Sequence, residues 1–324
     1  RDRVHAVDTL DGKEYQIKSK VVVNATGVFV DDVMKMDECD TRRKVRPSQG
    51  VHLVVDSKFL GGRSALMIPK TKDGRVLFGV PWHGKVVLGT TDTPLNEASL
   101  EPRALEEEVD FILDQAGQYL DRKPTRADVL SIFAGLRPLA APTHADSKKT
   151  KEISRNHKIY RSKSGLLTIT GGKWTTYRAM AEDVINQAIV IGGLSPAECV
   201  TKNLRVHGYT KEQFDENDWN YVYGSDASKI QKMIEKEPSF AEKLYEGYTF
   251  TAAHVVWAAR EEFAQNIEDV LARRVRMLFL DARAALKIAP KVASVLAAEL
   301  GKDKTWEQAQ IADFNRLARG YILN

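Results

Sequence analysis

The chain has 324 residues, of which 43% are hydrophobic and 28% are charged. This is a globular composition with enough apolar residues for a sizeable core, and the length favours two domains. The net charge of +4 arises from 48 basic and 44 acidic residues. Because the two signs are interspersed, the balance excludes a strong nucleic-acid signal but is compatible with a locally positive pocket for an anionic substrate.

The two cysteines, Cys39 and Cys199, are too few for a disulfide framework or a metal cluster, so we expect a reducing compartment. No apolar run approaches the roughly 20 residues needed to span a bilayer. Residues 1–7 lack the apolar region and the cleavage site of a signal peptide, and the chain begins without methionine, as if inside a domain. We therefore expect a fragment of a longer protein.

Residues 1–30 are predicted to form a hairpin and then a buried strand. Asp11-Gly12 between the apolar runs 4–7 and 15–17 is a strong hairpin signal. The run 21–23 is continuously apolar, as in a fully buried strand. It ends in Asn24-Ala25-Thr26-Gly27, where glycine permits a close turn.

The next segment is predicted to be an antiparallel sheet followed by a helix. Short apolar runs separated by glycine-containing turns indicate strands at 51–55, 65–68, 76–80 and 86–89. The helix is expected over 102–120, with Pro102 in its first turn and glutamates at 106–108 near its positive end. Its apolar face is Leu105, Val109, Ile112, Leu113 and Ala116.

A strand at 129–133 leads into Gly135-Leu136-Arg137-Pro138-Leu139, and the polar stretch 143–152 is predicted to be a loop. Strands at 158–161 and 166–170 then precede a helix that opens at 171. We expect this helix to end at Gly192-Gly193. Its predicted inward residues are Met180, Val184, Ile185 and Ala188.

Helical periodicity dominates beyond residue 200. The predicted helices are 226–245, 251–264, 268–288, 290–300 and 305–318. We place a domain boundary between 195 and 210, which gives an α+β fold with a mixed or antiparallel sheet in residues 1–200 and an all-α domain in 201–324.

The strongest local feature is Gly171-Gly172-Lys173-Trp174-Thr175, where a strand passes through paired glycines into a helix. Free backbone N–H groups and the positive end of the helix dipole would face whatever lies in front. Such a turn can bind an anion or a cofactor, and it can equally be an ordinary strand–turn–helix junction.

Arg137 follows an apolar strand, and its guanidinium stays charged. If buried, it would need an anion such as phosphate or carboxylate; the alternative is a salt bridge or an exposed side chain. Arg155 lies in a charged stretch where exposure is the default. It gains interest only if it converges with Arg137.

His52 follows Arg46-Pro47-Ser48-Gln49-Gly50-Val51 and is placed one residue into a strand. A histidine can act as a general base near neutral pH, although a hydrogen-bonded strand histidine is the commoner case. Trp82, Thr90, Thr91 and Asp92 can each cap a strand or form a turn. His144, in the polar loop, is expected to be exposed, and no metal-binding motif is present.

Five segments together resemble the FAD-dependent glycerol-3-phosphate dehydrogenases and oxidases in order and spacing, and the helical end around residues 260–283 is similar to that family's C-terminal domain. They are Val22–Gly27, Arg46–His52, Gly89–Asp92, Gly135–Leu139 and Gly171–Arg178.

The resemblance implies hydride transfer from C2 of sn-glycerol 3-phosphate to FAD, giving dihydroxyacetone phosphate, and reoxidation by a quinone or oxygen. It implies that His52 and Arg137 are catalytic, and that His52 takes the C2 hydroxyl proton. Arg137, Arg155, Lys173 and Thr175 would bind substrate. The residues implied to bind the cofactor are Ala25, Thr26, Gly27, Gly171, Gly172, Lys173, Trp174 and Thr175.

The family's FAD domain opens with a Gly-x-Gly-x-x-Gly fingerprint, which this sequence lacks. We therefore expect an incomplete FAD domain in residues 1–200, weak or absent FAD binding and no activity of this chain alone. The resemblance is compatible with a cytoplasmic protein attached peripherally to the inner face of the cell membrane, and with a homodimer.

Two other functions stay open at this point. One is an amine or amino-acid oxidase, because those flavoproteins share the Asn-Ala-Thr-Gly turn and bind a carboxylate with arginine. The other is a non-catalytic interaction module formed by the basic helices beyond residue 250. Arg273, Arg274 and Arg276 are clustered there, but acidic residues flank them.

Overall fold

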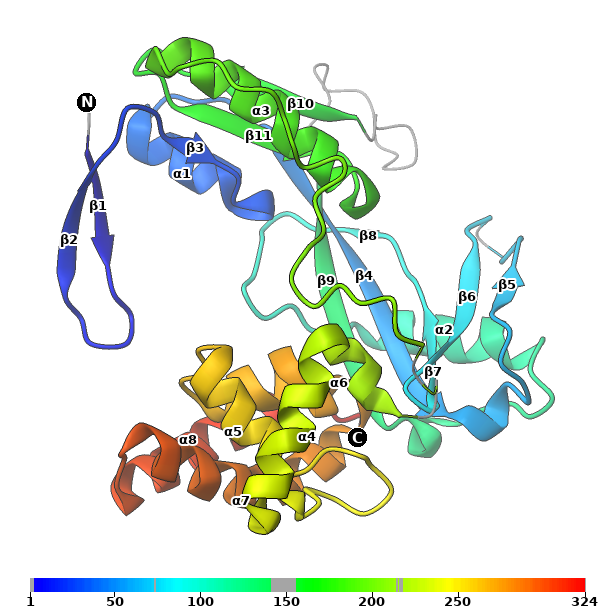
Figure 1. Cartoon of the computed structure of the whole chain (residues 1–324). Helices are drawn as coiled ribbons and strands as arrows, with labels where there is room; N and C mark the ends of the chain where they lie inside the picture. The colour runs from blue at the N-terminus through cyan, green and yellow to red at the C-terminus, as the bar shows by residue number, and fades with distance from the viewer. Residues whose placement is uncertain (1–2, 73, 141–155, 214, 216–217, 324) are drawn as a thin grey trace. The chain divides into compact units, whose positions relative to one another are not determined.

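In the computed structural model, residues 3–72, 74–140, 156–213, 215 and 218–323 are described. The chain forms two compact units, each assembled from three segments. Unit 1 is Arg1–Gly50, Asp92–Pro102 and Gly135–Leu204; unit 2 is Val51–Thr91, Arg103–Ala134 and Arg205–Asn324. Two strands, β4 (Val45–Asp56) and β9 (Ser131–Ala140), carry the chain from one unit to the other (Figure 1).

Unit 1 opens with the predicted hairpin, in which β1 (Arg3–Val7) pairs antiparallel with β2 (Glu14–Lys18). A second, three-stranded sheet has the order β10 (His157–Arg161), β11 (Leu167–Gly171) and β3 (Val23–Asn24). β3 runs parallel to β11, whereas β10 is antiparallel to it. The predicted strand over 21–23 is therefore shorter, and its valines are half-buried rather than fully buried.

Two helices accompany this sheet. α1 (Val30–Asp37) follows the 3-10 turn η1 (Gly27–Phe29), and α3 (Tyr177–Gly192) follows η5 (Trp174–Thr176). Val184 and Ala188 of α3 pack on Leu167 and Ile169 of β11, but Ile185 is 52% exposed, so the prediction that it faces inward is wrong. α3 ends at Gly193 in the left-handed conformation, as predicted.

The largest sheet has the strand order β5 (Leu66–Ile68), β6 (Leu77–Trp82), β7 (Lys85–Gly89), β4 and β8 (Thr93–Pro94), and β9 also pairs with β4. The paired neighbours β5–β6, β6–β7, β7–β4 and β4–β8 are antiparallel, as the sequence predicts. In unit 2, buried residues of β4 to β7 form a core with α2 (Glu106–Gly117).

α2 is shorter than predicted, because Pro102 precedes the helix and Leu105 is its N-cap. Glu108 reaches back so that its Oε2 accepts a hydrogen bond from Leu105 N at 3.0 Å. The predicted face is otherwise confirmed, since Val109, Ile112, Leu113 and Ala116 are buried.

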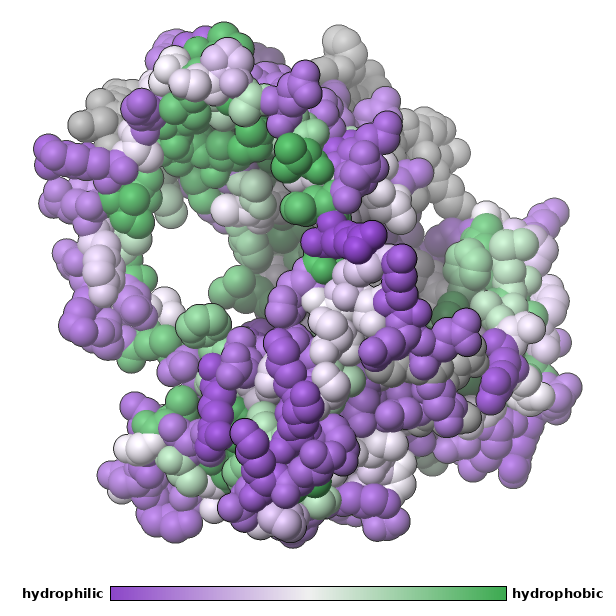
Figure 2. Space-filling view, in the orientation of Figure 1, coloured by the Kyte–Doolittle hydropathy of each residue, from purple (hydrophilic) through white to green (hydrophobic). Residues whose placement is uncertain are grey.

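The end of the chain is helical, as predicted. In Figure 2 these helices present a mainly hydrophilic face. Apolar side chains gather instead over α1, β3 and β11 of unit 1. The buried faces of the C-terminal helices form one large core and a second, smaller one that contains Tyr223, Ile230, Ala253 and Trp257. None of the described helices is both long and apolar enough to cross a bilayer. The elements are η6 (Trp219–Asp226), α4 (Ala227–Lys236), η7 (Pro238–Ala241), α5 (Ala252–Glu261), the π-helical η8 (Asp269–Arg274), α6 (Met277–Leu280), α7 (Ala282–Leu300) and α8 (Lys304–Arg319).

Two of these boundaries correct the sequence prediction. The helix expected over 226–245 ends at Lys236, because Pro238 disfavours a helical residue before it. The helix expected over 268–288 is interrupted at Arg276, whose backbone is left-handed (φ 56°), and α7 then runs through Pro290. The shorter elements η2 (Ser57–Phe59) and η3 (Arg126–Asp128) lie in unit 2.

Candidate functional site

The turn after β11 brings the backbone close to its surroundings. Gly171 and Gly172 both have left-handed φ values, of 78° and 73°. A Cβ atom at Gly171 would lie 2.8 Å from Asn156 O, and one at Gly172 would lie 2.5 Å from Met180 Sδ. Only glycine fits this turn, and it leaves the start of the following helix open to a ligand.

The end of β3 lies beside this turn, because β3 and β11 are parallel neighbours whose carboxyl ends meet at one sheet edge. The buried Asn24 fixes the turn that follows: its Nδ2 donates to Val30 O at 2.9 Å and to Thr168 Oγ1 at 3.2 Å. Thr26 Oγ1 donates to Asn24 Oδ1 at 2.7 Å. The sequence Asn24-Ala25-Thr26-Gly27 is thus a hydrogen-bonded turn that faces the glycine pair.

Both turns line one cavity of about 570 Å³, which lies within unit 1. It contains two side chains that bear positive charge, Arg137 and Lys173. Apolar side chains, including Leu136, Leu139 and Met180, complete the wall. The predicted site residues that the structure brings together here are Ala25, Gly27, Arg137, Gly171, Gly172, Lys173 and Trp174.

Arg137 lies inside β9, which continues to Ala140 rather than ending before the arginine. Its Nη1 is 3.7 Å from Asp92 Oδ1, and Ser48 Oγ donates a hydrogen bond to the same carboxylate. A Cβ at Gly50 would lie 2.3 Å from Arg137 Nη2, so the guanidinium lies on the bare backbone of β4.

These contacts explain two motifs whose roles sequence reasoning missed. Ser48 and Gly50 of the Arg-Pro-Ser-Gln-Gly segment, together with Asp92, form the support that orients Arg137. The tertiary fold brings these three residues to Arg137 from distant parts of the sequence. The sequence alone therefore showed that the motifs are present together, but not that they contact one another.

The residues present fit a flavin with its anionic groups. Thr170 Oγ1 is buried on the cavity wall and has no hydrogen-bond partner among the described residues, so a polar ligand atom would satisfy it. Trp174 is 84% exposed and stacks on Tyr177, with ring centroids 5.3 Å apart. The glycine turn admits a flat ring system, and the two cations favour an anion.

Other predicted residues lie elsewhere. Thr26 and Thr175 flank the turns without lining the cavity, and the hydroxyl that accepts from Lys173 N belongs to Thr176, at 3.3 Å. His52 lies in the interior of β4 in unit 2, stacked on Phe133 with centroids 5.2 Å apart. Arg155 and His144 lie outside the described residues.

Thr91 and Trp82, which the sequence analysis placed at strand ends or turns, have roles in the fold. Thr91 is buried; its Oγ1 accepts from Val51 N at 3.0 Å and donates to Glu108 Oε1 at 2.8 Å. Trp82 ends β6 and lines a cavity of about 600 Å³ in unit 2, together with His52, Arg273 and Arg276.

The sequence matches known families over most of its length. The family described as FAD dependent oxidoreductase matches residues 1–178, and the C-terminal domain of alpha-glycerophosphate oxidase matches residues 167–308. A solved glycerol-3-phosphate dehydrogenase from Bacillus halodurans, complexed with FAD, is similar with a TM-score of 0.83 and 27% identity; the match covers 99% of this chain and 66% of that one.

Curated relatives include a mitochondrial glycerol-3-phosphate dehydrogenase of Arabidopsis thaliana, 39% identical over 334 residues, which covers 94% of this chain and 52% of the relative. The mitochondrial glycerol-3-phosphate dehydrogenase of Homo sapiens is 36% identical over 325 residues, covering 94% of this chain and 44% of the relative. The chain spans about half the length of the curated relatives it matches. By the match to more than half of its residues, the chain belongs to the family of FAD-dependent oxidoreductases.

Proposed function

We propose that this chain supplies the substrate-binding part of an enzyme that oxidises sn-glycerol 3-phosphate to dihydroxyacetone phosphate. One observation carries the proposal: Arg137 and Lys173 line the same cavity as the Gly171–Gly172 turn. The two cations can form charge-assisted hydrogen bonds with a phosphate monoester. The glycine turn lets a flat cofactor approach the backbone N–H groups at the helix start. The names of the relatives in Arabidopsis thaliana and Homo sapiens agree with this substrate.

FAD, when bound, supplies the acceptor for the hydride that leaves C2 of the substrate. In this proposal Arg137 and Lys173 bind the phosphate oxygens and hold the substrate in one orientation, which lowers the entropic part of the barrier. Asp92 and Gly50 keep the Arg137 guanidinium in place. The backbone N–H groups that follow Gly172, just before α3, would stabilise the negative charge that a bound flavin gains when it is reduced. The sequence resemblance assigns the C2 hydroxyl proton to His52, which the structure places in unit 2 on the wall of a different cavity.

The proposal is tested on the gene product that contains this chain, with Arg137→Met and Lys173→Met. Each variant should raise KM for glycerol 3-phosphate about tenfold or more, because a charge-assisted hydrogen bond contributes about 1.5–3 kcal/mol. Arg161→Met is the matched control, since Arg161 is an exposed strand arginine of unit 1 outside the cavity.

The substrate class is tested in the same preparation. Turnover on glycine or D-amino acids in place of glycerol 3-phosphate would reject the proposal in favour of an amine or amino-acid oxidase. Unchanged KM in both cavity variants would reject the assignment of the two cations even if glycerol 3-phosphate is oxidised.

We further propose a quinone or oxygen as the electron acceptor and a cytoplasmic protein attached peripherally to the membrane, possibilities that the sequence resemblance raised. The acceptor is identified by comparing oxygen consumption with anaerobic reduction of a soluble quinone. Fractionation of cells before and after a high-salt wash tests the location, and release by salt is the expected result. The relatives in Arabidopsis thaliana and Homo sapiens are named as mitochondrial proteins.

A further inference from the structure

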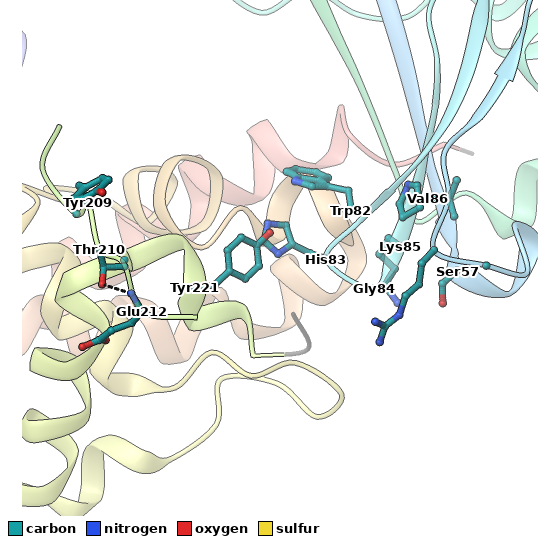
Figure 3. A pocket seen from close by; sticks show the side chains of 15 residues that line it. Ser57, Trp82, His83, Gly84, Lys85, Val86, Tyr209, Thr210, Glu212 and Tyr221 are labelled. Atoms are coloured by element: carbon teal, nitrogen blue, oxygen red, sulfur yellow. Dashed lines mark hydrogen bonds between the residues drawn. The ribbon is translucent and has the colours of Figure 1, made fainter. Parts of the chain in front are cut away.

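Unit 2 contains a second polar cavity, of about 530 Å³, which shares no residue with the glycine-turn cavity. It is lined by η6, by the turn between β6 and β7, and by residues at and after η8. A neighbouring hollow of about 880 Å³ shares Trp82, His83 and Tyr221 with it and is shown in Figure 3. No role in the proposed reaction has been assigned to the polar side chains of this cavity.

Tyr223 contributes to this cavity a buried hydroxyl group that lacks a hydrogen-bond partner among the described residues. Its side chain is 8% exposed. Burial, followed by the nearby Glu262 carboxylate, raises the pKa of Tyr223, so the hydroxyl keeps its proton. A buried hydroxyl left unpaired costs about 1–3 kcal/mol, which a ligand atom would recover.

Glu262 presents a second unfilled atom to the same cavity. Its Oε1 accepts from Trp257 Nε1 at 3.3 Å, whereas its Oε2 lies 3.9 Å from Arg274 Nε in an ion pair and is buried without a hydrogen bond in the described part of the chain. Burial raises the pKa of this carboxyl group. At 3.9 Å Arg274 Nε is too far from Oε2 to donate a hydrogen bond, so a hydroxyl group of a ligand can donate one to this oxygen.

His83 occupies an unusual position beside these two residues. It forms a two-residue turn with Gly84 between β6 and β7, and its φ of 47° is left-handed, a conformation that asparagine or glycine adopts more readily. Its ring lies against Tyr221, with centroids 5.7 Å apart, as Figure 3 shows. Its Nδ1 is buried with no hydrogen-bond partner among the described residues.

Arg276 supplies the charge. It also has a left-handed backbone, and it lines the cavity with Arg273 and Arg274. Both of those arginines form ion pairs with Asp269, and Arg274 also pairs with Glu262, but across the described residues no carboxylate lies within ion-pair distance of Arg276. After burial, the charge of Arg276 is the second factor that lowers the pKa of His83, so the two side chains sense each other.

We propose that this cavity is a binding site for a small organic anion that carries hydroxyl groups, such as a phosphorylated or carboxylated polyol. The anionic group pairs with Arg276, and the hydroxyl groups bond to Tyr223 Oη and Glu262 Oε2. The volume lies in the range of about 300–1,000 Å³ that small-molecule sites occupy. A metal ion is a poorer occupant, since the described residues contain no cluster of three or more metal-ligating side chains.

The ligand class is tested by isothermal titration of the whole chain with four probes. Glucose 6-phosphate and gluconate each combine an anion with hydroxyl groups, whereas inorganic phosphate and glucose each offer one feature alone. We expect at least one of the hydroxylated anions to bind about tenfold more tightly than either single-feature probe. Equal binding of all four, or no heat with any of them at millimolar concentration, overturns the proposal.

Variants locate the binding. Tyr223→Phe removes only the unpaired hydroxyl, so the melting temperature without ligand should be unchanged or higher, while affinity falls about tenfold. Arg276→Gln should abolish the preference for anions, and Arg276→Lys should restore part of it. Tyr119→Phe and Arg316→Gln are the matched controls, because both side chains are exposed in unit 2 away from the cavity.

The proposal fails if Tyr223→Phe and Arg276→Gln bind the tighter probe as the unchanged chain does. It fails equally if the binding is lost in the controls, because the probe then occupies another surface. Neither result depends on the oxidation of glycerol 3-phosphate, so the two proposals can be accepted or rejected separately.

Discussion

The guanidinium of Arg137 lies directly on the backbone of Gly50, and a Cβ atom at that glycine would come within 2.3 Å of Nη2. The contact joins β4 to β9 within unit 1 and leaves the arginine no room to move toward the strand. Asp92 Oδ1 lies 3.7 Å from Nη1 and forms an ion pair with the guanidinium. The position of this cation therefore depends on the absence of a side chain at residue 50.

We expect Gly50→Ala to displace Arg137 without unfolding the chain, because the clash is with the far end of a flexible side chain. Affinity for glycerol 3-phosphate should fall about tenfold, the equivalent of ~1.4 kcal/mol. Gly135→Ala is the control, since a Cβ there meets nothing within 4 Å. The affinity of each variant is measured by titrating the gene product that contains this chain with glycerol 3-phosphate. Equal affinities for the two variants would contradict the proposed contact.

The glycine turn after β11 gives a prediction about stability. Gly171→Ala combines a left-handed backbone with a Cβ atom only 2.8 Å from the backbone oxygen of Asn156, which cannot move freely. Gly193→Ala has the left-handed backbone (φ 56°) but open space around its Cβ. The second variant should lose about 1–2 kcal/mol of unfolding free energy, and the first about 1–3 kcal/mol more.

Urea denaturation of the two variants in parallel separates the strain from the clash. If Gly171→Ala is no less stable than Gly193→Ala, the turn is looser than the structure indicates. A Cβ atom at residue 171 would then fit beside the backbone oxygen of Asn156 without a clash.

The sequence predicts the glycine turn because its signal is local. A strand, two glycines and a helix start are read from consecutive residues, and the cavity forms where that turn meets the end of β3. The same holds for the first hairpin and for the antiparallel order of β5 to β7. In each case neighbouring residues determine the backbone conformation.

The support of Arg137 could not be predicted in this way, because Ser48, Asp92 and Arg137 lie far apart in the sequence. A periodicity argument likewise cannot tell which sheet a helix packs on. Between 195 and 210, where the boundary was predicted, the chain passes from Leu204 to Arg205 and so enters unit 2 for the third time. The inclusion of residues 51–91 and 103–134 in that same unit depends on tertiary contacts that local patterns do not specify.

His254 gives a prediction about pH. It is 2% exposed, its Nδ1 accepts a hydrogen bond from Thr251 N at 2.9 Å, and its Nε2 lies 2.7 Å from Asn220 Oδ1. These partners define a neutral ring with its proton on Nε2. Burial lowers the pKa of His254 to about 4, whereas the unfolded chain has a value of about 6.5.

Between these two values the unfolded chain binds a proton that the folded chain does not. The contribution of His254 to the free energy of unfolding should therefore be fully present above about pH 6.5. It should fall as the pH is lowered toward 4, by about 3 kcal/mol in total. Urea unfolding of the chain and of His254→Gln across that range measures the contribution as a difference in slope. Parallel curves for the two proteins would show that the buried imidazole does not titrate as its surroundings require. A steeper loss in the unchanged chain would assign the acid sensitivity to Nδ1 of His254, because a proton on that nitrogen removes the hydrogen bond that it accepts from Thr251 N.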